Sequence, residues 1–177
     1  MNGNNRGERT VSESQDRVTE LIEEKRAISK VLRTIANSPH DLQPIFDTIL
    51  DSATRLCRAD AGTLRLVEKE GYRLAAQKVR TYSPPTILEH GSHLGRLMAS
   101  GKVIHVPDAL ALEQYRKGET SVVTAAEGGH VRTAVYVPMF RNDQVIGALG
   151  IWREQVELFT DKQIELVTDF AAQATIA

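Results

Sequence analysis

Few side chains in the sequence have the type and spacing that covalent or metal chemistry requires. His90 and His93 stand three residues apart near a predicted helix start, but no acidic or thiolate ligand lies at helical spacing beside them. Cys57 is the only cysteine, which excludes an intrachain disulfide and a four-thiolate metal site. No Ser, His and Asp set and no carboxylate pair can be assigned to one site. We therefore expect neither a metal site nor catalytic residues, and we interpret Cys57 as a small buried apolar side chain.

Two glycine-containing segments invite comparison with known motifs, and both fail on spacing. In GRLMASGKV, five residues separate Gly95 from Gly101 where a phosphate-binding loop has four, and Val103 replaces the Ser or Thr that binds magnesium. In GSHLG, the glycines do not flank Ser92 as they flank a nucleophilic serine. We expect Ser92 to cap the helix that follows it.

The balance of charge and hydropathy limits the partners of the chain. Its 22 basic and 23 acidic residues almost cancel and are interspersed, so no broad field attracts nucleic acid or an anionic membrane. No segment approaches the roughly 20 apolar residues of a membrane span, and no apolar run near the N-terminus resembles a signal peptide. We expect a cytoplasmic protein, because a single cysteine fits a reducing compartment.

The N-terminal segment is predicted to hold a disordered tail and a long helix. Residues 1–11 are polar and rich in Asn and Gly, with nothing to bury. The helix is predicted to start at Ser12, which forms a capping-box pattern with Gln15, and to stop before Ser38-Pro39. We treat residues 12–38 as a helical linker or dimerisation helix.

This helix carries a regular apolar pattern. Apolar residues recur in alternating steps of three and four, with Lys25 as an interruption, at Val18, Leu21, Ile28, Leu32 and Ile35. The spacing is typical of a coiled-coil seam, which favours a homodimer. The alternative is a helix that packs on its own domain, because the run is shorter than a firm coiled-coil assignment needs.

The remainder of the chain alternates between short strands and helices. A helix over residues 40–59, which Asp41 can cap, precedes a hairpin over 61–77. The segment around a double proline is expected to be irregular, and a short helix, a short strand and a weakly helical segment follow it over 93–129. A second hairpin over 131–152 and a last helix, which begins at Thr160 in a capping-box pattern with Gln163, complete the order. This order is typical of an α+β domain: a mainly antiparallel sheet of five to six strands with helices packed on it, preceded by the long N-terminal helix.

The final segment, VRTAVYVPMFRNDQVIGALGIWREQVELFTDKQIELVTDFAAQATIA, resembles the closing half of a GAF domain. It has a hydrophobic strand ending in Val-Pro-Met, a turn, a strand with the pattern Ile-Gly-x-Leu, and a Phe-Thr pair that opens a helix rich in Ala and Gln. Earlier segments agree with the first hairpin, short helix and leading helix of the family: LRLVEKEGYRLAA, GSHLGRLMASGKVIHVPD and PIFDTILDSATRLCRADAG. The resemblance covers residues 39–177. With SKVLRTIANSPHDLQPIFDTI before it, the domain is similar to bacterial input modules of sensor histidine kinases and nucleotide cyclases.

The resemblance implies a non-catalytic sensory module of a signal-transduction protein. Such a module binds a small molecule between one sheet face and the crossover segments, and it passes a change through its terminal helices. By this resemblance we expect an unidentified small-molecule ligand and an effector domain, a kinase or a cyclase, that this chain lacks. The alternative is a purely structural dimerisation module whose pocket is filled by its own side chains. A ligand site would have a volume of about 300 to 1,000 Å³.

Departures from better-known GAF subfamilies exclude several ligands and reactions. Relatives that attach a bilin use a cysteine in the crossover, and this crossover has none, so we expect no covalent bilin. Reduction of free methionine sulfoxide relies on several cysteines, and Cys57 alone cannot complete a thiol redox cycle. The signature of the cyclic-nucleotide-binding relatives is not evident. The cofactor or ligand is therefore unknown from the sequence.

The resemblance also indicates candidate ligand-binding residues. The crossover would roof the cavity, and it carries the candidates Tyr82, His93, Arg96, Asp108 and Tyr115. Strand alternation places Arg65 with Thr63, and Arg132 with Tyr136, each pair on one strand face. A buried arginine is costly without a partner, so Arg65 or Arg132 in the cavity would favour an anionic ligand. The alternative is that both arginines are solvated or paired with loop acids such as Asp108 or Glu127.

Overall fold

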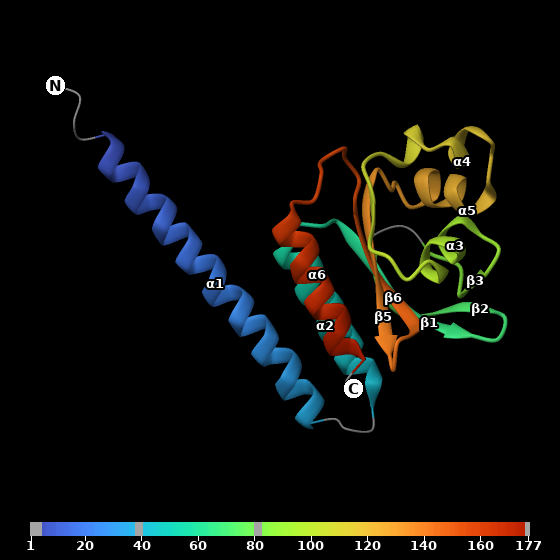
Figure 1. Cartoon of the computed structure of the whole chain (residues 1–177), viewed down its shortest axis with the longest axis horizontal. Coiled ribbons are helices and arrows are strands. Elements are labelled where there is room, and N and C mark those ends of the chain that lie inside the picture. Colours follow the sequence, from blue (N-terminus) through green and yellow to red (C-terminus); the bar gives the residue numbers. More distant parts are fainter. Residues whose placement is uncertain (1–4, 38–40, 80–82, 176–177) are drawn as a thin grey trace.

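The computed structural model describes residues 5–37, 41–79 and 83–175 (Figure 1). The helices and helical turns have these bounds: α1 (Asn5–Asn37), α2 (Leu42–Leu56), α3 (His93–Ala99), η1 (Ala109–Ala111), α4 (Glu113–Arg116), α5 (Thr120–Val123), η2 (Thr124–Gly128) and α6 (Asp161–Ala174). The strands have these bounds: β1 (Ala61–Glu68), β2 (Gly71–Lys78), β3 (Ile87–Glu89), β4 (Ile104–Val106), β5 (Thr133–Arg141) and β6 (Gln144–Arg153).

The six strands of the described residues form one antiparallel sheet in the order β3-β2-β1-β6-β5-β4. The two predicted hairpins, β1 with β2 and β5 with β6, meet where β1 pairs with β6. The predicted α+β fold class is confirmed. One strand is an addition, because we expected the segment around the double proline to be irregular. In the structure, Ile87–Glu89 of that segment pairs with the outer edge of β2.

The turn between β5 and β6 follows from its two residues, Asn142 and Asp143. Their φ angles are positive, 50° and 62°, as a two-residue type I′ turn requires. Asn and Asp enter this left-handed region more readily than other non-glycine residues, because their short side chains bond locally. The turn fixes the register of the hairpin, with Arg141 opposite Gln144.

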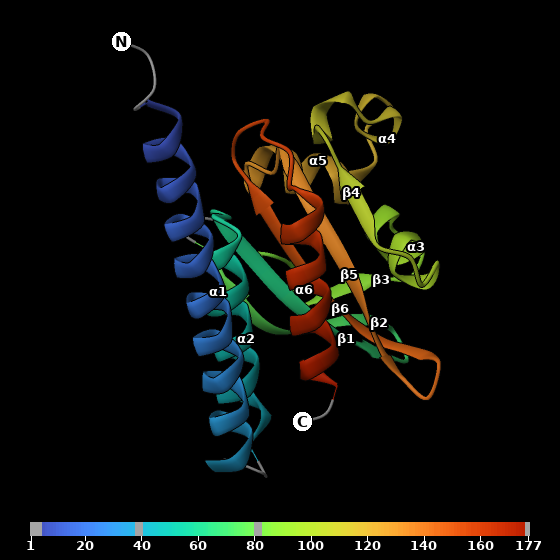
Figure 2. The same cartoon turned by 60° about the vertical axis from the view of Figure 1, so that its left-hand side comes forward.

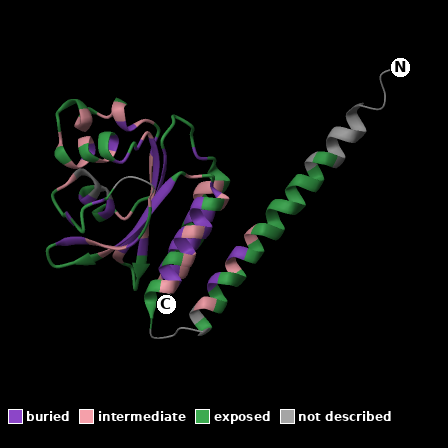
Figure 3. Cartoon of the chain, turned by 180° about the vertical axis from the view of Figure 1, so that it is seen from behind, coloured by how far each residue is buried: buried purple, intermediate pink, exposed green. Residues whose placement is uncertain are grey.

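One face of the sheet is covered by α2 and α6, as Figure 2 shows. Alternate strand residues point into this layer and are fully buried there: Leu64, Val135, Leu149 and Ile151. The helices contribute fully buried residues of their own: Ile45, Ile49, Val167 and Phe170. Burying one such side chain contributes about 1.5 to 3 kcal/mol. This helical layer therefore forms the main hydrophobic core, which appears as the buried zone of Figure 3.

Helix α1 begins at Asn5 rather than at the predicted Ser12. Residues 5–11, which we expected to belong to a disordered tail, are helical. The capping signal at Ser12 does not start the helix, because the helical backbone continues through residues 5–11. With 33 residues, α1 is roughly 50 Å long, and it projects beyond the domain (Figure 1).

The C-terminal half of α1 lies alongside α2 (Figure 2). Ala27 and Val31 are buried in the main core. Ion pairs extend the contact to α6, because Lys162 Nζ lies 3.0 Å from Glu20 Oε2 and 3.2 Å from Glu24 Oε1. The helix therefore packs on its own domain, which was one of the two alternatives. The contact is made by Ala27 and Val31, which do not belong to the predicted seam.

The predicted seam is largely exposed. The exposed fractions of Val18, Leu21 and Leu32 are 55%, 53% and 53%. Ile28 is half-buried, and the side chain of Ile35 lies outside the described residues. Figure 3 shows the outer length of α1 as exposed. These residues remain accessible to a partner, and dimerisation stays a prediction.

Three predicted helix caps are confirmed. Asp41 Oδ1 accepts a hydrogen bond of 3.1 Å from the backbone two residues later, at the start of α2. Thr160 and Gln163 form a capping box at the start of α6. Ser92 Oγ accepts a hydrogen bond of 3.0 Å from the backbone N–H of Gly95, in the first turn of α3. Each cap satisfies a backbone donor that the helix itself leaves unpaired.

The described helices include none whose length and apolar character would suffice to cross a membrane. Within the same part of the chain, no group of three or more His, Cys, Asp or Glu residues is placed to hold a metal ion. His90 instead contacts the ring of Tyr72 edge-on, with 5.0 Å between ring centroids.

Candidate ligand-binding cavity

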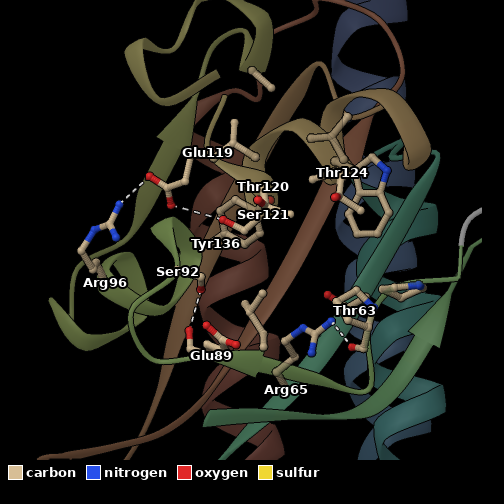
Figure 4. Close-up of a pocket in the computed structure, with 18 of the residues that line it drawn as sticks. Thr63, Arg65, Glu89, Ser92, Arg96, Glu119, Thr120, Ser121, Thr124 and Tyr136 are labelled. Atoms are coloured by element: carbon tan, nitrogen blue, oxygen red, sulfur yellow. Dashed lines mark hydrogen bonds and ion pairs between the residues drawn. The ribbon is translucent and has the colours of Figure 1, made fainter. Parts of the chain in front are cut away.

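The second face of the sheet is covered by the crossover, which is the segment between β2 and β5. A cavity of about 920 Å³ lies between the helical parts of the crossover and this face. Its walls combine apolar side chains with hydroxyl groups and charged groups (Figure 4). Ligand sites in proteins have volumes of about 300 to 1,000 Å³ and this kind of mixed lining. The volume therefore lies within the range that we expected for a ligand site.

The floor of the cavity consists of strand residues that point away from the helical layer. Thr63 and Arg65 come from β1, Tyr136 from β5, and Trp152 from β6. Because successive strand residues point to opposite faces, the same strands supply the main core and the cavity floor. The prediction that Arg65 and Thr63 share a face agrees with this arrangement.

The ring of Tyr136 lies against Gly150, its partner on β6. A Cβ atom at position 150 would lie 2.7 Å from Tyr136 Cδ1 and 2.9 Å from Tyr136 Cε1. Any side chain at this position would therefore displace the ring into the cavity. Glycine at position 150 lets the tyrosine lie close to the sheet and keeps the space above it open.

Arg65 is the charged residue that is buried among the described lining residues, with 4% of its surface exposed. Its Nη1 donates a hydrogen bond of 3.0 Å to Tyr72 O, and its Nη2 donates one of 2.9 Å to Pro85 O. Both acceptors are backbone carbonyl groups, and these bonds hold the guanidinium group at the wall of the cavity. Figure 4 shows this side chain at the cavity wall.

An ion pair joins two parts of the roof (Figure 4). Arg96 Nη2 on α3 donates to Glu119 Oε2 at 2.8 Å, and Arg96 Nη1 donates to Gly91 O. Glu119 Oε1 also accepts a hydrogen bond of 3.3 Å from Ser121 Oγ. The pair connects α3 to the start of α5, next to the hydroxyl group of Thr120, which also lines the cavity.

The predicted site residues Asp108 and Arg132 do not line the cavity. Arg132 Nε and Nη2 each donate a hydrogen bond of 2.9 Å to the carboxylate of Asp108. The hydrogen bond from Arg132 holds the pKa of Asp108 below its ordinary value of 3.8. The strand alternation that placed Arg132 with Tyr136 does not extend to Arg132, because β5 begins one residue later, at Thr133. For Arg132, the alternative of pairing with a loop acid is correct.

Tyr115 is a further predicted residue that does not line the cavity. Its hydroxyl group donates a hydrogen bond of 3.1 Å to Glu127 Oε1, which raises the pKa of Tyr115. Tyr82 and the side chain of His93 lie outside the described residues. The predicted candidates that the structure brings together are Arg65, Arg96 and Tyr136.

Several lining residues were not predicted as site residues: Thr63, Glu89, Ser92, Glu119, Thr120, Ser121, Thr124 and Trp152. Trp152 had a usable signal, since alternation along β6 separates it from the core residues Leu149 and Ile151. The crossover residues had no such signal, because short helical turns carry no period from which a face can be read.

Cys57 lies on the helical side of the sheet and not in the cavity. It is fully buried in the main core. Burial raises the pKa of its thiol to about 12, and its Sγ donates to Gln163 O at 3.6 Å. The interpretation of Cys57 as a small buried apolar side chain is confirmed as far as its burial is concerned.

Arg153 is another buried arginine on the helical side, with 3% of its surface exposed. Its Nη1 donates to Glu157 O at 2.9 Å and to Leu158 O at 3.1 Å, and its Nη2 donates to Cys57 O at 2.8 Å. The guanidinium group also lies 4.3 Å from the centroid of the Phe159 ring. Arg153 thus joins the end of β6 to the end of α2 and to the segment that leads into α6.

An antiparallel six-stranded sheet with one helix-covered face and one hollow face defines an α+β domain with a roofed cavity. A family model for the GAF domain matches residues 39–177. The chain belongs to the GAF family.

Solved structures of GAF domains share this fold at low sequence identity. Free methionine-R-sulfoxide reductase from Neisseria meningitidis, solved with its substrate, has a TM-score of 0.70 and 16% identity, with 86% of each chain covered. The GAF domain of an Acinetobacter phosphoenolpyruvate-protein phosphotransferase has a TM-score of 0.68 and 15% identity, with 89% of this chain and 90% of that chain covered. A domain of a protein described as a two-component sensor histidine kinase from Sinorhizobium meliloti has a TM-score of 0.60 and 16% identity, with 77% and 90% covered. No curated protein matches the sequence. These neighbours include sensor and enzyme proteins. They therefore establish the fold but do not distinguish between a sensory and an enzymatic function.

Proposed function

We propose that this chain is a non-catalytic sensory GAF module that binds a small molecule in its cavity and relays the event through α1 and α6. The observation that carries the proposal is the cavity of about 920 Å³, whose lining combines apolar walls with a buried arginine and several hydroxyl groups. A purely structural module would have filled this space with its own side chains. The open volume therefore favours the sensory function over the structural alternative.

The proposal that the module has no catalytic turnover is supported by the position of its only thiol. Cys57 is buried on the side of the sheet that faces away from the cavity, and burial raises the pKa of its thiol to about 12. At neutral pH the group is therefore a thiol and not a nucleophilic thiolate. The chain has no second cysteine to resolve an oxidised one. Cys57→Ser should leave ligand binding unchanged, whereas reductase activity lost in that variant would contradict the proposal.

The route proposed for the relay runs along β6. Trp152 lines the cavity, and the next residue, Arg153, holds the segment that leads into α6. Gln163 in the first turn of α6 donates to Cys57 O at 3.1 Å, the same acceptor that Arg153 uses. A change in the strand at the cavity would therefore reach the start of α6 through one shared set of hydrogen bonds. A kinase or cyclase effector and a two-component system remain part of this proposal.

The proposal is tested by native mass spectrometry of the protein purified from its source. A sensory module should carry a noncovalent mass that is released by denaturation, and the spectrum reports the oligomeric state at the same time. The control is Ala125→Trp, which places a large side chain at the cavity wall and should reduce the bound fraction. Absence of any bound mass in wild-type protein from several growth conditions would support the structural alternative instead.

The homodimer is the second part of the proposal, and the exposed apolar residues of α1 support it. Leu21→Asp combined with Leu32→Asp should yield monomers in sedimentation experiments, because both side chains lie on the predicted seam and outside the main core. A matched control is Glu23→Ala, an exposed position on the same helix. A monomeric wild type at tens of micromolar would show that the seam is not an interface.

A further inference from the structure

The segment that connects β6 to α6, residues 154–160, is held by the crossover. The backbone N–H of Phe159 donates a hydrogen bond of 3.3 Å to Nε2 of His105, which lies on β4. Two residues further along the crossover, Pro107 O accepts a hydrogen bond of 2.7 Å from Thr133 Oγ1. The same hydroxyl group accepts one of 3.2 Å from a backbone N–H of the connecting segment. The crossover therefore holds this segment at two points, one directly and one through β5.

The residue between these two points borders the cavity. Val106 lines the cavity, whereas His105 precedes it on β4 and points to the opposite face, because successive strand residues alternate. On that face the ring of His105 meets the ring of Phe159 edge-on, with 6.1 Å between centroids. Phe159 is buried in the main core. One short strand thus contacts the cavity through one residue and the segment that leads into α6 through its neighbour.

Charged groups from two further elements face His105. Arg153 on β6 lies 4.3 Å from the centroid of the Phe159 ring, and Asp161 belongs to the first turn of α6. Glu157 of the connecting segment pairs with Arg153 at 2.9 Å. Burial and the positive charge of Arg153 lower the pKa of His105 below its ordinary value of 6.5, while Asp161 acts in the opposite direction. The imidazole is therefore uncharged at neutral pH, and its Nε2 is free of a proton and accepts the hydrogen bond.

Protonation of His105 would change this contact in two ways. An imidazolium carries a proton on each ring nitrogen, so Nε2 would no longer accept a hydrogen bond and the N–H of Phe159 would lose its partner. A buried donor without a partner is costly. The imidazolium would also bring a second positive charge close to Arg153, and like charges in a partly buried site disfavour each other. Both effects favour separation of β4 from the connecting segment.

We propose that His105 is a pH-sensitive latch between the crossover and α6, closed while its imidazole is neutral and opened by its protonation. The inference deepens the proposed function, because it adds a proton as a regulator of the route from the cavity to α6. With the latch open, the contact through Thr133 and the hydrogen bonds of Arg153 still hold the connecting segment. Acidification would therefore weaken the connection of the cavity to α6 without unfolding the domain.

Nuclear magnetic resonance of the labelled wild-type protein tests the latch directly. The ring signals of His105 report its titration, and the amide of Phe159 reports the hydrogen bond through its chemical shift and its protection from hydrogen exchange. We expect the protection factor of this amide to fall about two- to tenfold as the pH is lowered through the titration of His105, which is the range that loss of one hydrogen bond gives. The amide of Leu149, in the main core, is the internal control and should stay protected.

Variants separate the acceptor from its charge. His105→Gln keeps an acceptor that does not titrate, so the protection of Phe159 should persist at neutral pH and stay constant on acidification. His105→Leu has no acceptor, so the protection should be low at every pH. His90→Gln, the same change as the first at an exposed histidine, should leave the pH dependence intact. Asp161→Asn removes the nearby negative charge and should shift the titration of His105 to lower pH.

Stability gives a second measurement of the same group. Because the pKa of His105 is lower in the folded protein than its ordinary value, the folded state binds fewer protons than the unfolded chain in this window. The wild type should therefore lose free energy of unfolding relative to His105→Gln as the pH falls below 6.5. Above that pH the difference between the two proteins should be constant. Urea denaturation at a series of pH values measures it.

Three results would overturn the inference. The first is a titration of His105 that leaves the Phe159 amide unchanged in the wild type. The second is a pH dependence of that amide that persists in His105→Gln. The third is a His105 that stays uncharged until the whole domain unfolds. Each leaves the proposed function to be judged by native mass spectrometry, because a ligand retained by the purified protein would still make the module a sensor without this latch.

Discussion

The two faces of the sheet differ in how completely their side chains fill the space above them. On the helical face, Leu149 and Ile151 of β6 are fully buried against α2 and α6. On the cavity face, Trp152 of the same strand borders an open volume, and Gly150 lies under the ring of Tyr136, which lines that volume. The residues alternate along one strand, so one backbone serves both faces. The difference teaches that a dense layer on one side holds the sheet in place, which permits the other side to remain hollow.

Charged groups follow the same division. Arg153 on the helical face is enclosed by carbonyl oxygens and the ring of Phe159, and it joins three segments of the chain. Arg65 on the cavity face is fixed by two carbonyl oxygens, while it also borders the open volume. The two buried arginines therefore lie on opposite faces of the sheet, one in the dense layer and one at the wall of the cavity.

The largest expected effect is a difference in stability between equivalent truncations on the two faces. Leu149→Ala, in the main core, should lower the free energy of unfolding by about 2 to 5 kcal/mol, because it leaves a cavity in a close-packed layer. Leu112→Ala is the same change at a half-buried residue that lines the existing cavity, and it should cost less than about 1 kcal/mol. Urea denaturation followed by circular dichroism measures both. Equal losses would contradict the division of the sheet into a dense face and a hollow face.

A smaller effect is expected where the two faces meet in one strand, at Gly150. Gly150→Ala places a Cβ atom 2.7 Å from the ring of Tyr136, and overpacking of this kind costs about 1 to 3 kcal/mol. The displaced ring should also alter Trp152 fluorescence, because both side chains line the cavity. Tyr136→Ala in the same chain should restore most of the loss in thermal unfolding experiments. Gly91→Ala is the control, since a Cβ atom there meets nothing within 4 Å. A loss that persists in the double variant would show that the tyrosine ring is not its cause.

The smallest expected effect concerns Asp108, which pairs with Arg132 outside the cavity. The folded protein has a lowered pKa at Asp108, so the pair contributes stability above the ordinary pKa of 3.8 and loses it as pH falls through the folded value. Asp108→Asn should therefore reduce stability slightly at neutral pH, and the difference from wild type should shrink below pH 3.8. The pair is partly exposed, and solvent weakens such pairs. A double-mutant cycle of Asp108→Asn and Arg132→Gln checks that the pH dependence comes from this pair. The free energy of unfolding of each variant is measured by denaturation across this pH range. A difference that grows with acidity would contradict it.

Much of the fold could be predicted because its signals are local. The caps at Asp41, Ser92 and Thr160 are formed by side chains that bond to the backbone within a few residues. The hairpins follow from alternation and from turn residues such as Asn142. For the same reason, Arg65 was assigned correctly to the face that it shares with Thr63.

Predictions that extended a local pattern beyond its element failed. The alternation that included Arg132 was counted past the start of β5, and the start of α1 was taken from a cap rather than from helix propensity. The seam of α1 was read correctly as apolar, but the stripe that packs on the domain, with Ala27 and Val31, lies on another side of the helix. A short apolar pattern does not show which of two helix faces packs on the core, because the apolar residues of both faces recur with the period of a helix.

The sequence by itself determined the family, the order of the elements and the two-sided strands, because caps, turns and alternation depend on neighbours in the chain. Only the tertiary structure decided that Asp108 pairs with Arg132, that Arg96 and Glu119 meet above the sheet, and that the ring of Tyr136 lies against Gly150. These outcomes depend on how the crossover packs on strands distant in sequence. Such packing depends on the fold of the whole domain, because the position of each residue in a contact is set by the other contacts that its element makes.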